Sequence, residues 1–231
     1  MAGDQFTDAI GSAHALSREI HDRNFTTGLQ MNEHMKAVEL RKAFRLINYG
    51  PTVLVSARHN GIDNVMAAAW CCALDIDPPK LTVVVDRIAR TRTLLEASRR
   101  FVIQVPTVAQ LRLTHEVGNR SLYEEPDKLQ ASGVTVFDVP GHDLPFVEGC
   151  SAWLACELVD EPHIRDAYDL FIGDVTAAWA DDRVFRDGHW HFETAGPEWR
   201  SLHHVAGGHF YAIGEALSVE AEPAERAPPS P

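Results

Sequence analysis

The sequence predicts a mainly β protein, an antiparallel β-barrel with helical insertions. Many short runs are rich in β-branched and aromatic residues, and turn residues separate them. Few segments carry the 3.6-residue periodicity of an amphipathic helix. No G-x-G-x-x-G sequence follows a predicted strand, which argues against a Rossmann nucleotide domain.

The first barrel strand is predicted at residues 51–57, and a tight turn follows it. Asn60-Gly61 supplies the positive φ angles that a two-residue hairpin needs. The chain returns in a strand that begins near Asn64. Residues 77–80 contain two prolines and predict another turn, before a β-branched strand at 81–85.

The second half alternates helices with longer strands. A basic, hydroxyl-rich segment opens a helix, and Pro106 ends the strand after it. The glycine pair Gly207-Gly208 gives the backbone freedom where another group approaches closely. The predicted elements are helix 94–99, strand 101–105, helix 108–117, and strands 134–137, 150–159, 169–179 and 184–192, with 150–159 central and paired antiparallel to 169–179.

The composition predicts three regions. Residues 1–35 form an N-terminal arm, partly helical or disordered, with a short helix at 8–22. Residues 36–218 form the barrel domain. Residues 219–231 are rich in Pro, Ala and Glu and are expected to be disordered.

Charge and cysteine content exclude several classes of protein. The formal net charge is −12 and the pI about 5.4, so a broad nucleic-acid or anionic-membrane surface is not expected. No apolar run approaches the ~20 residues that span a bilayer, and the N-terminus lacks a signal pattern. The four cysteines show no C-x-x-C spacing, and Cys71 and Cys72 are expected on opposite faces of a strand. A cytoplasmic protein with reduced thiols follows.

One stretch combines a flat wall with a possible anion site. Ala67-Ala68-Ala69 would let a planar ring lie against the backbone, although small residues also serve tight core packing. Arg87, Arg90 and Arg92 stand with Thr91 and Thr93 where a helix begins, and a helix N-terminus favours phosphate. The same arginines could equally form a solvated helix start. A flavin mononucleotide (FMN) needs these two surfaces, one for its ring and one for its phosphate.

In their order, these motifs resemble the flavin reductase-like family with an FMN-binding split β-barrel, which includes flavoredoxin. The resemblance extends from about Arg41 to Glu215. The residues that carry it are Pro51–Ser56, Asn64–Trp70, Asp77–Pro79, Asp86-Arg87, Thr91-Arg92, Leu94–Ser98, Phe101, Val105-Pro106, Asp127-Lys128, Cys156–Leu158, Leu170–Val175 and Gly207-Gly208.

The resemblance implies a homodimer with FMN near the subunit interface. It implies electron transfer from NADH or NADPH through FMN to free flavin or another acceptor, without a catalytic side-chain acid or base. Thr91, Arg87 and Arg92 would hold the phosphate, and Lys128 would reach the flavin. The isoalloxazine ring would lie against Asn64, Met66, Ala67, Ala68, Ala69 and Trp70.

Each of these residues also has a purely structural interpretation. Asn64 could be a polar residue of an edge strand, and Trp70 could belong to the core. Thr91 is a good N-cap for the following helix. Lys128 could form a solvated ion pair with Asp127.

The sequence departs from the family at one position that bears on chemistry. Ala167-Tyr168-Asp169 stands where members often have Gly-Asp-His, so the histidine beside the ring is missing. Two alternatives therefore stay open. One is a flavoredoxin-type electron carrier that does not use nicotinamide, and the other is a split barrel that has lost flavin and serves as a binding module.

The chain has 12 histidines, but no metal site is expected. His189-Trp190-His191 would place two imidazoles on one strand face, and His203, His204 and His209 follow. A zinc site would need a third ligand from elsewhere in the fold. The absence of a G-x-S-x-G sequence argues against serine hydrolase chemistry.

Overall fold

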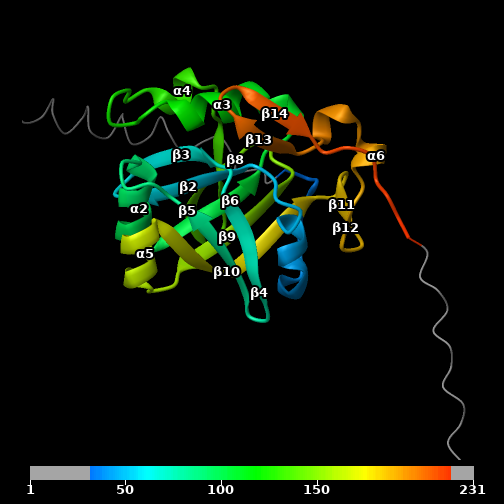
Figure 1. The fold of residues 1–231 in the computed structure, drawn as a ribbon, viewed down its shortest axis with the longest axis horizontal. Helices are drawn as coiled ribbons and strands as arrows, with labels where there is room; N and C mark the ends of the chain where they lie inside the picture. Colours follow the sequence, from blue (N-terminus) through cyan, green and yellow to red (C-terminus); the bar gives the residue numbers. More distant parts are fainter. Residues whose placement is uncertain (1–31, 220–231) are drawn as a thin grey trace, which may run out of the picture.

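The structure, a computed structural model, describes residues 32–219 (Figure 1). The predicted helix at 8–22 and nearly all of the predicted tail at 219–231 lie outside these residues. Within the described part, an eight-stranded antiparallel sheet forms the body of the molecule, which confirms the mainly β prediction.

The large sheet is open between two strands that follow one another in the chain. Its order is β3-β2-β6-β9-β10-β5-β4, and β1 pairs with β10. Ala69 and Trp70 link the edge strands β3 and β4, so the barrel is split at this link. The strands are β1 (Met35–Ala37), β2 (Val53–His59), β3 (Ile62–Ala68), β4 (Cys71–Ile76), β5 (Pro79–Val84), β6 (Arg100–Val105), β9 (Ala152–Leu158) and β10 (Leu170–Asp181).

The central strand β9 is apolar from Ala152 to Cys156, where both of its faces are buried, and its one charged residue, Glu157, is exposed. Leu154 and Cys156 point into the barrel core, whereas Trp153 and Ala155 point into a second core on the other face. The predicted pairing of β9 with β10 is confirmed, with Trp153 opposite Trp179. The predicted hairpin turn is confirmed too, since Asn60 has φ 51° and Gly61 φ 72°.

Three two-stranded sheets surround the large one. They are β7 (Val136–Val139) with β8 (His142–Val147), β11 (Phe185–Arg186) with β12 (His189–Trp190), and β13 (Leu202–Ala206) with β14 (His209–Ala212). The predicted last strand at 184–192 is therefore wrong. It splits into β11 and β12, because Asp187 and Gly188 turn the chain with positive φ, and α6 follows.

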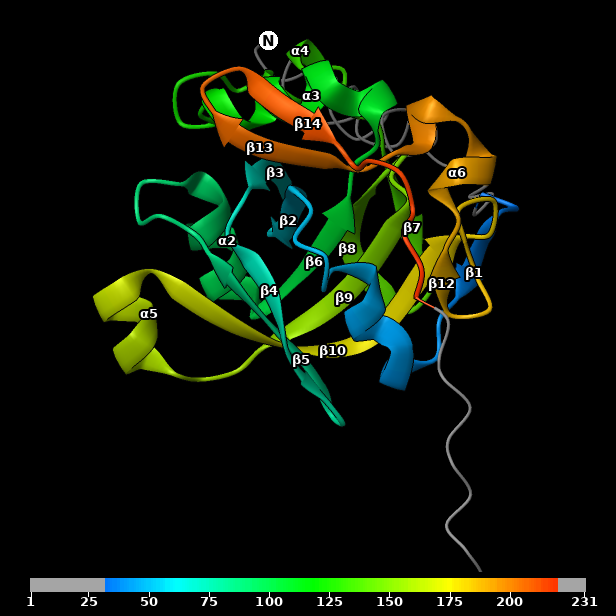
Figure 2. The same cartoon turned by 45° about the vertical axis from the view of Figure 1, so that its right-hand side comes forward.

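Helices lie around the margins of the sheet. They are the α-helices α2 (Arg90–Ser98), α3 (Leu111–Asn119), α4 (Lys128–Ala131), α5 (Pro162–Tyr168) and α6 (Phe192–Ala195), and the 3₁₀ helices η1 (Leu40–Leu46), η2 (Val108–Gln110) and η3 (Pro197–Trp199). Figure 2 shows α3 with β13 and β14 over β2 and β3, and α2 and α5 together at one side. Each helix between residues 32 and 219 is too short or too polar to traverse a lipid bilayer.

A buried polar network ties β8 to the large sheet below α3. The Ser56 hydroxyl donates to the carbonyl of Pro145 at 2.6 Å, and the Gln104 amide donates to Ser56 at 2.9 Å. The backbone N–H of Val147 completes the network by donating to Gln104. Because each of these polar atoms has a partner, the network holds β8 in place against β2 and β6.

Candidate functional site

A cavity of about 530 Å³ opens where the barrel is split. The end of β3 and its link to β4 form one wall, and α3 with the β13–β14 hairpin forms the other. Figure 2 shows α3 and this hairpin above β3. Five of the residues named from the sequence line this cavity, namely Met66, Ala67, Ala68, Ala69 and Trp70. Trp70 is 75% exposed, so its interpretation as a core residue is wrong.

The two walls converge at one close contact. A Cβ placed on Gly118 of α3 would lie 3.3 Å from the Cβ of Ala67, which is a tight contact, so the helix lies close to the strand here. Gly118 and Ala67 both line the cavity, so this approach of α3 to β3 bounds it on one side.

Asn64 lies behind this wall and is buried. Its Nδ2 donates to the Thr91 hydroxyl at 2.9 Å, but its Oδ1 has no hydrogen-bond partner within the described residues. A buried amide oxygen without a partner costs free energy, so this atom is free to accept a bond from a ligand. Asn64 does belong to an edge strand, β3, but its side chain is buried within the described part of the chain.

Thr91 is not the N-cap of the helix. The helix α2 begins at Arg90 with Ala89 as its cap, and Thr91 is fully buried in its first turn. The Thr91 side chain is therefore used to hold Asn64 in place. The first turn of α2 still presents backbone N–H groups beside the arginines.

Arg87 and Arg92 have different surroundings. Arg92 is buried, bonds to Glu96 at 3.0 Å and to Asp169, and lies 5.2 Å from the centroid of the Phe171 ring. Arg87 is 65% exposed and reaches Asp169 at only 3.4 Å. The hydrogen bond from Arg92 holds the pKa of the Asp169 carboxyl below its usual value. Arg92 is thus committed to an internal ion pair, whereas Arg87 is free to turn toward an anion.

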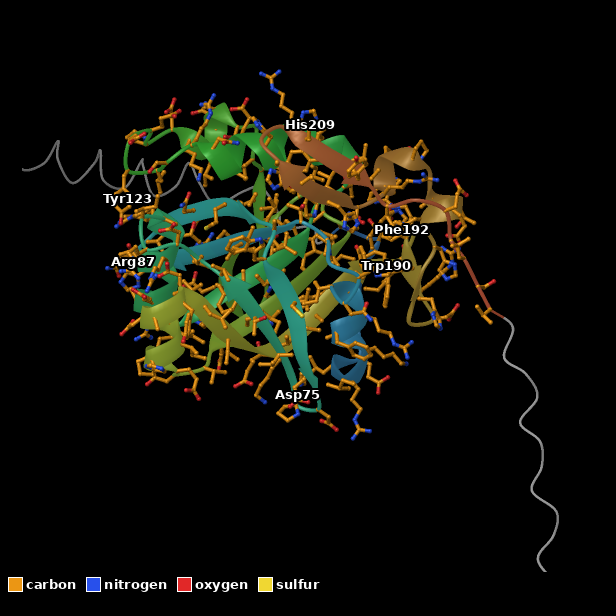
Figure 3. The ribbon with its side chains drawn as sticks, viewed as in Figure 1. Asp75, Arg87, Tyr123, Trp190, Phe192 and His209 are labelled. Atoms are coloured by element: carbon orange, nitrogen blue, oxygen red, sulfur yellow. The ribbon has the colours of Figure 1, made fainter. Side chains whose placement is uncertain are left out.

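Arg90 is a further cation at this end of α2. Its guanidinium lies 5.2 Å from the centroid of the Tyr123 ring, and the Tyr123 hydroxyl is 2.8 Å from that of Thr93. Hydrogen bonds with Thr93 and Arg90 lower the pKa of Tyr123. Figure 3 shows Arg87 and Tyr123 at the same side of the molecule. Arg90 could be named from the sequence as a donor, but the family resemblance assigned no role to it.

Lys128 is buried rather than solvated. It is 2% exposed, and burial lowers its pKa to about 8. It does not line the cavity at the split, and no ion pair joins it to Asp127 within the described residues. The interpretation as a solvated ion pair is therefore wrong.

The second wall of the cavity was not predicted from the sequence. It is made by Thr114, His115 and Asn119 of α3 and by His204, Val205 and Phe210 of the hairpin. The one sequence signal was Gly207-Gly208, at the turn between β13 and β14, where Gly207 has φ 54°. Thr114 gave no signal, because a threonine in an amphipathic helix looks like any other polar position.

The histidines 189 and 191 do not share a strand face. His189 belongs to β12, whereas His191 is the N-cap of α6. Among residues 32–219, the group with metal-ligand spacing is instead His34 with Asp181 and Asp182. The Asp181 carboxylate already accepts bonds from the Arg183 side chain at 2.8 and 2.6 Å, so an ion pair uses its oxygens.

Comparisons with known proteins place this chain among flavin proteins. The profile of the flavin reductase-like domain matches residues 44–197. The chain is 38% identical over 185 residues to the uncharacterized protein YddH of Escherichia coli, covering 79% of this chain and 96% of YddH.

Two solved structures carry the similarity further. The structure of an FMN-binding domain of a flavin reductase-like enzyme from Shewanella baltica is 62% identical, with a TM-score of 0.81, covering 83% of this chain and all of that one. The flavoredoxin of Desulfovibrio vulgaris is 25% identical, with a TM-score of 0.61, over 74% of this chain and 90% of its own.

Proposed function

The chain belongs to the flavin reductase-like family, and from this premise we propose that it is an FMN-binding oxidoreductase. In the proposed reaction, electrons pass from NADH or NADPH through FMN to free flavin or another acceptor. When bound, FMN supplies the hydride and electron chemistry, and the protein supplies binding and orientation.

The observation that carries this proposal is the cavity at the split of the barrel, with the unpaired Oδ1 of the buried Asn64 behind one of its walls. Its volume of about 530 Å³ lies within the range of about 300–1,000 Å³ for small-molecule sites. The flat wall of Ala67, Ala68 and Ala69 suits a planar ring. Asn64 lies behind this wall and does not line the cavity, and we assign its unpaired Oδ1 to a hydrogen-bond donor at the edge of the ring.

The phosphate would lie outside the cavity, at the first turn of α2. Asp86 lines the cavity, and Arg87 follows it directly, so the two regions are continuous. Arg87 and Arg90 would supply charge, and the free N–H groups of the helix would supply donors. Arg92 would act indirectly by holding Asp169, and Thr91 would do so by holding Asn64.

A flavoredoxin-type electron carrier is the second candidate. The observation that favours it is Asp169, which stands where family members often carry a histidine beside the ring and which is engaged by Arg92 and Arg87. An aspartate held in this way offers no imidazole to the ring. In this second candidate the protein would hold FMN but exchange electrons with a protein partner rather than with nicotinamide.

We also propose that two copies of the chain associate, with FMN near the interface. Three large apolar side chains in or beside the edge strand β4, Trp70, Leu74 and Ile76, are each more than half exposed. Trp70 belongs both to this surface and to the cavity. A second copy covering β4 would therefore also cover the mouth of the cavity.

An absorbance spectrum before and after loading with FMN and desalting tests the flavin assignment. Retained flavin bands near ~450 nm are expected. Stopped-flow mixing with NADH and with NADPH then separates the two candidates, since direct bleaching of the flavin supports the reductase. A colourless protein with no affinity for FMN in a titration would contradict both.

A further inference from the structure

The α3 wall of the cavity contains a buried hydroxyl that nothing in the described chain satisfies. Thr114 is fully buried and lines the cavity, yet its Oγ1 has no hydrogen-bond partner within residues 32–219. A helix threonine usually bonds to a backbone carbonyl one turn back. An unpaired buried hydroxyl costs free energy, so its presence at a cavity wall indicates a ligand atom.

His115 is the next residue on α3 and also lines the cavity. Within the described residues its imidazole makes no hydrogen bond, and the Phe210 ring packs against it with the centroids 6.4 Å apart. Phe210 also packs against His204 at 4.9 Å, and the His204 Nε2 is 3.0 Å from the carbonyl oxygen of Gly207. Packing therefore orients His115 and leaves its ring nitrogens free for a ligand.

The charges around the cavity decide which ligands fit. No lysine or arginine of the described residues lines it, and Asp86 is its one carboxylate. A ligand with a phosphate inside this cavity would have no counter-charge. The α3 wall therefore suits an uncharged molecule, whose oxygen accepts hydrogen bonds from the hydroxyl and the imidazole.

We propose that Thr114 and His115 bind a carbonyl oxygen of a small quinone, which is the electron acceptor of this protein. The inference rests on the proposed function. The quinone takes two electrons and one proton, which leave NAD(P)H as a hydride, and a second proton from solvent. The products are a hydroquinone and NAD(P)⁺. Phe210 and the ring bound at the opposite wall would enclose the planar quinone.

Duroquinone is the probe. All ring carbons of this quinone other than the carbonyls carry a methyl group, so the exposed thiol of Cys72 does not add to the ring. The oxidised, FMN-loaded protein is titrated without NAD(P)H, and the change in flavin absorbance gives the dissociation constant. Thr114→Val and His115→Phe keep the shape of each side chain and remove its hydrogen bond. Each should weaken duroquinone binding about three- to tenfold, as expected for one lost hydrogen bond.

Two variants serve as controls. Thr114→Ser keeps the hydroxyl and should bind duroquinone like the wild type. His209→Phe changes an exposed histidine of the same hairpin that does not line the cavity (Figure 3), and it should leave binding unchanged. The affinity for FMN, measured by fluorescence quenching, should stay within about twofold in all four variants.

Three results would overturn the assignment. Loss of FMN affinity in Thr114→Val would show that the hydroxyl serves the flavin instead. Unchanged duroquinone binding in both Thr114→Val and His115→Phe would remove the subsite. Binding of free nicotinamide with the same dependence on Thr114, and no binding of duroquinone, would assign the wall to the electron donor.

The proposed function can fail separately. If the wild-type protein does not bind FMN in the preceding titration, the flavin assignment is wrong. Calorimetric titration of the FMN-free protein with duroquinone then tests the subsite of Thr114 and His115 by itself. Binding that is lost in Thr114→Val would uphold it, and no heat of binding in the wild type would overturn it.

Discussion

Arg87 and Arg92 are five residues apart, and the family resemblance gives both of them to the phosphate. Their side chains, however, have different partners. Arg92 lies over Phe171 and bonds to Glu96 and Asp169, so removing it leaves the partly buried Asp169 carboxylate with only its longer contact to Arg87. Arg87 is mostly exposed and makes only long contacts. Arg92 therefore supports the fold around Asp169, whereas Arg87 is free to bind an anion.

Replacing each of these arginines by alanine should therefore give opposite results. Arg87→Ala should weaken FMN binding by about tenfold, because a charge-assisted bond to phosphate is lost, and should leave the unfolding free energy almost unchanged. Arg92→Ala should lower the unfolding free energy by about 1–3 kcal/mol. Fluorescence titration with FMN and urea unfolding measure the two quantities. Equal losses of FMN affinity without destabilisation would show that both arginines bind the phosphate.

Lys128 predicts a change of stability with pH. Its pKa is about 8 in the folded protein and near the ordinary value of 10.5 in the unfolded chain. Between these pH values the unfolded state binds a proton that the folded state does not, so the unfolding free energy rises with pH. In urea unfolding from pH 8 to 10.5, the wild type should gain about 2–3 kcal/mol relative to Lys128→Met.

An exposed lysine provides the control for this experiment. Lys36 is exposed, and Lys36→Met should follow the wild type across the same pH range. A constant difference between Lys128→Met and the wild type would mean that the lysine is charged in the folded state at pH 10.

At the residue scale, the sequence predicted one wall of the candidate site but not the other. Residues 64–70 form a continuous run of small and apolar side chains, and its order within the family motif made it recognisable. Thr114 and His115 lie on α3, whereas Phe210 lies on β14, 95 residues after His115. Only the tertiary fold brings them together. The role of Asn64 in holding Thr91 also depends on a contact across 27 residues.

In the element β10, one glycine leaves room for a large side chain of the barrel core. A Cβ on Gly173 would lie 2.6 Å from Cζ of Phe101 and 3.1 Å from Cβ of Cys156. Both of these neighbours are buried, and Phe101 is fully so. The ring of Phe101 therefore occupies the space that a side chain on β10 would need.

Adding a methyl group at this position should destabilise the barrel. Gly173→Ala should lower the unfolding free energy by about 1–3 kcal/mol, because the Phe101 ring or the strand must move. Gly214→Ala is a suitable control, since no atom of the described part of the chain lies within 4 Å of its Cβ position. Urea unfolding of both variants measures the difference. Equal stability of Gly173→Ala and the wild type would show that Phe101 can rotate away at little cost.

The elements that the sequence predicted well are those with a strong local pattern. The strands β2, β5, β6, β9 and β10 have long runs of buried, β-branched or aromatic residues, and both hairpin residues Asn60 and Gly61 are turn formers. The sequence did not predict α5, which is short and has no buried residue. It also did not separate β13 from β14, because their residues are mostly exposed and lack alternation.

At the scale of the whole molecule, the split between β3 and β4 explains where the candidate site lies. A closed barrel would pair these two strands, whereas here the short Ala69-Trp70 link leaves their edges apart. The space beside the link is filled from outside, by α3 and the β13–β14 hairpin. Three segments that are far apart in the chain therefore meet at a single opening, and a ligand there contacts all of them.

The β4–β5 hairpin projects from the body of the molecule, with Asp75 near its tip (Figure 3). Leu74 and Ile76 near this tip are 53% and 51% exposed, and β4 is an edge strand of the sheet that residues 32–219 form. An exposed apolar edge strand favours association with another chain. Since Trp70 continues this apolar surface to the mouth of the cavity, association through β4 would shield a bound ring from water.

Charges on this edge should therefore separate the proposed homodimer. Leu74→Glu with Ile76→Glu should shift the molar mass in light scattering from two chains to one, because two carboxylates would be buried without partners at the interface. Because Leu74 and Ile76 are exposed in the single chain, the two substitutions should have little effect on its folding. Ile62→Glu, at an exposed position of β3, is the control and should remain a dimer. A wild-type mass of one chain at micromolar concentration would refute the dimer. If instead the double variant keeps the mass of two chains, the interface lies on another face, and the exposed surface of β4 needs a different explanation.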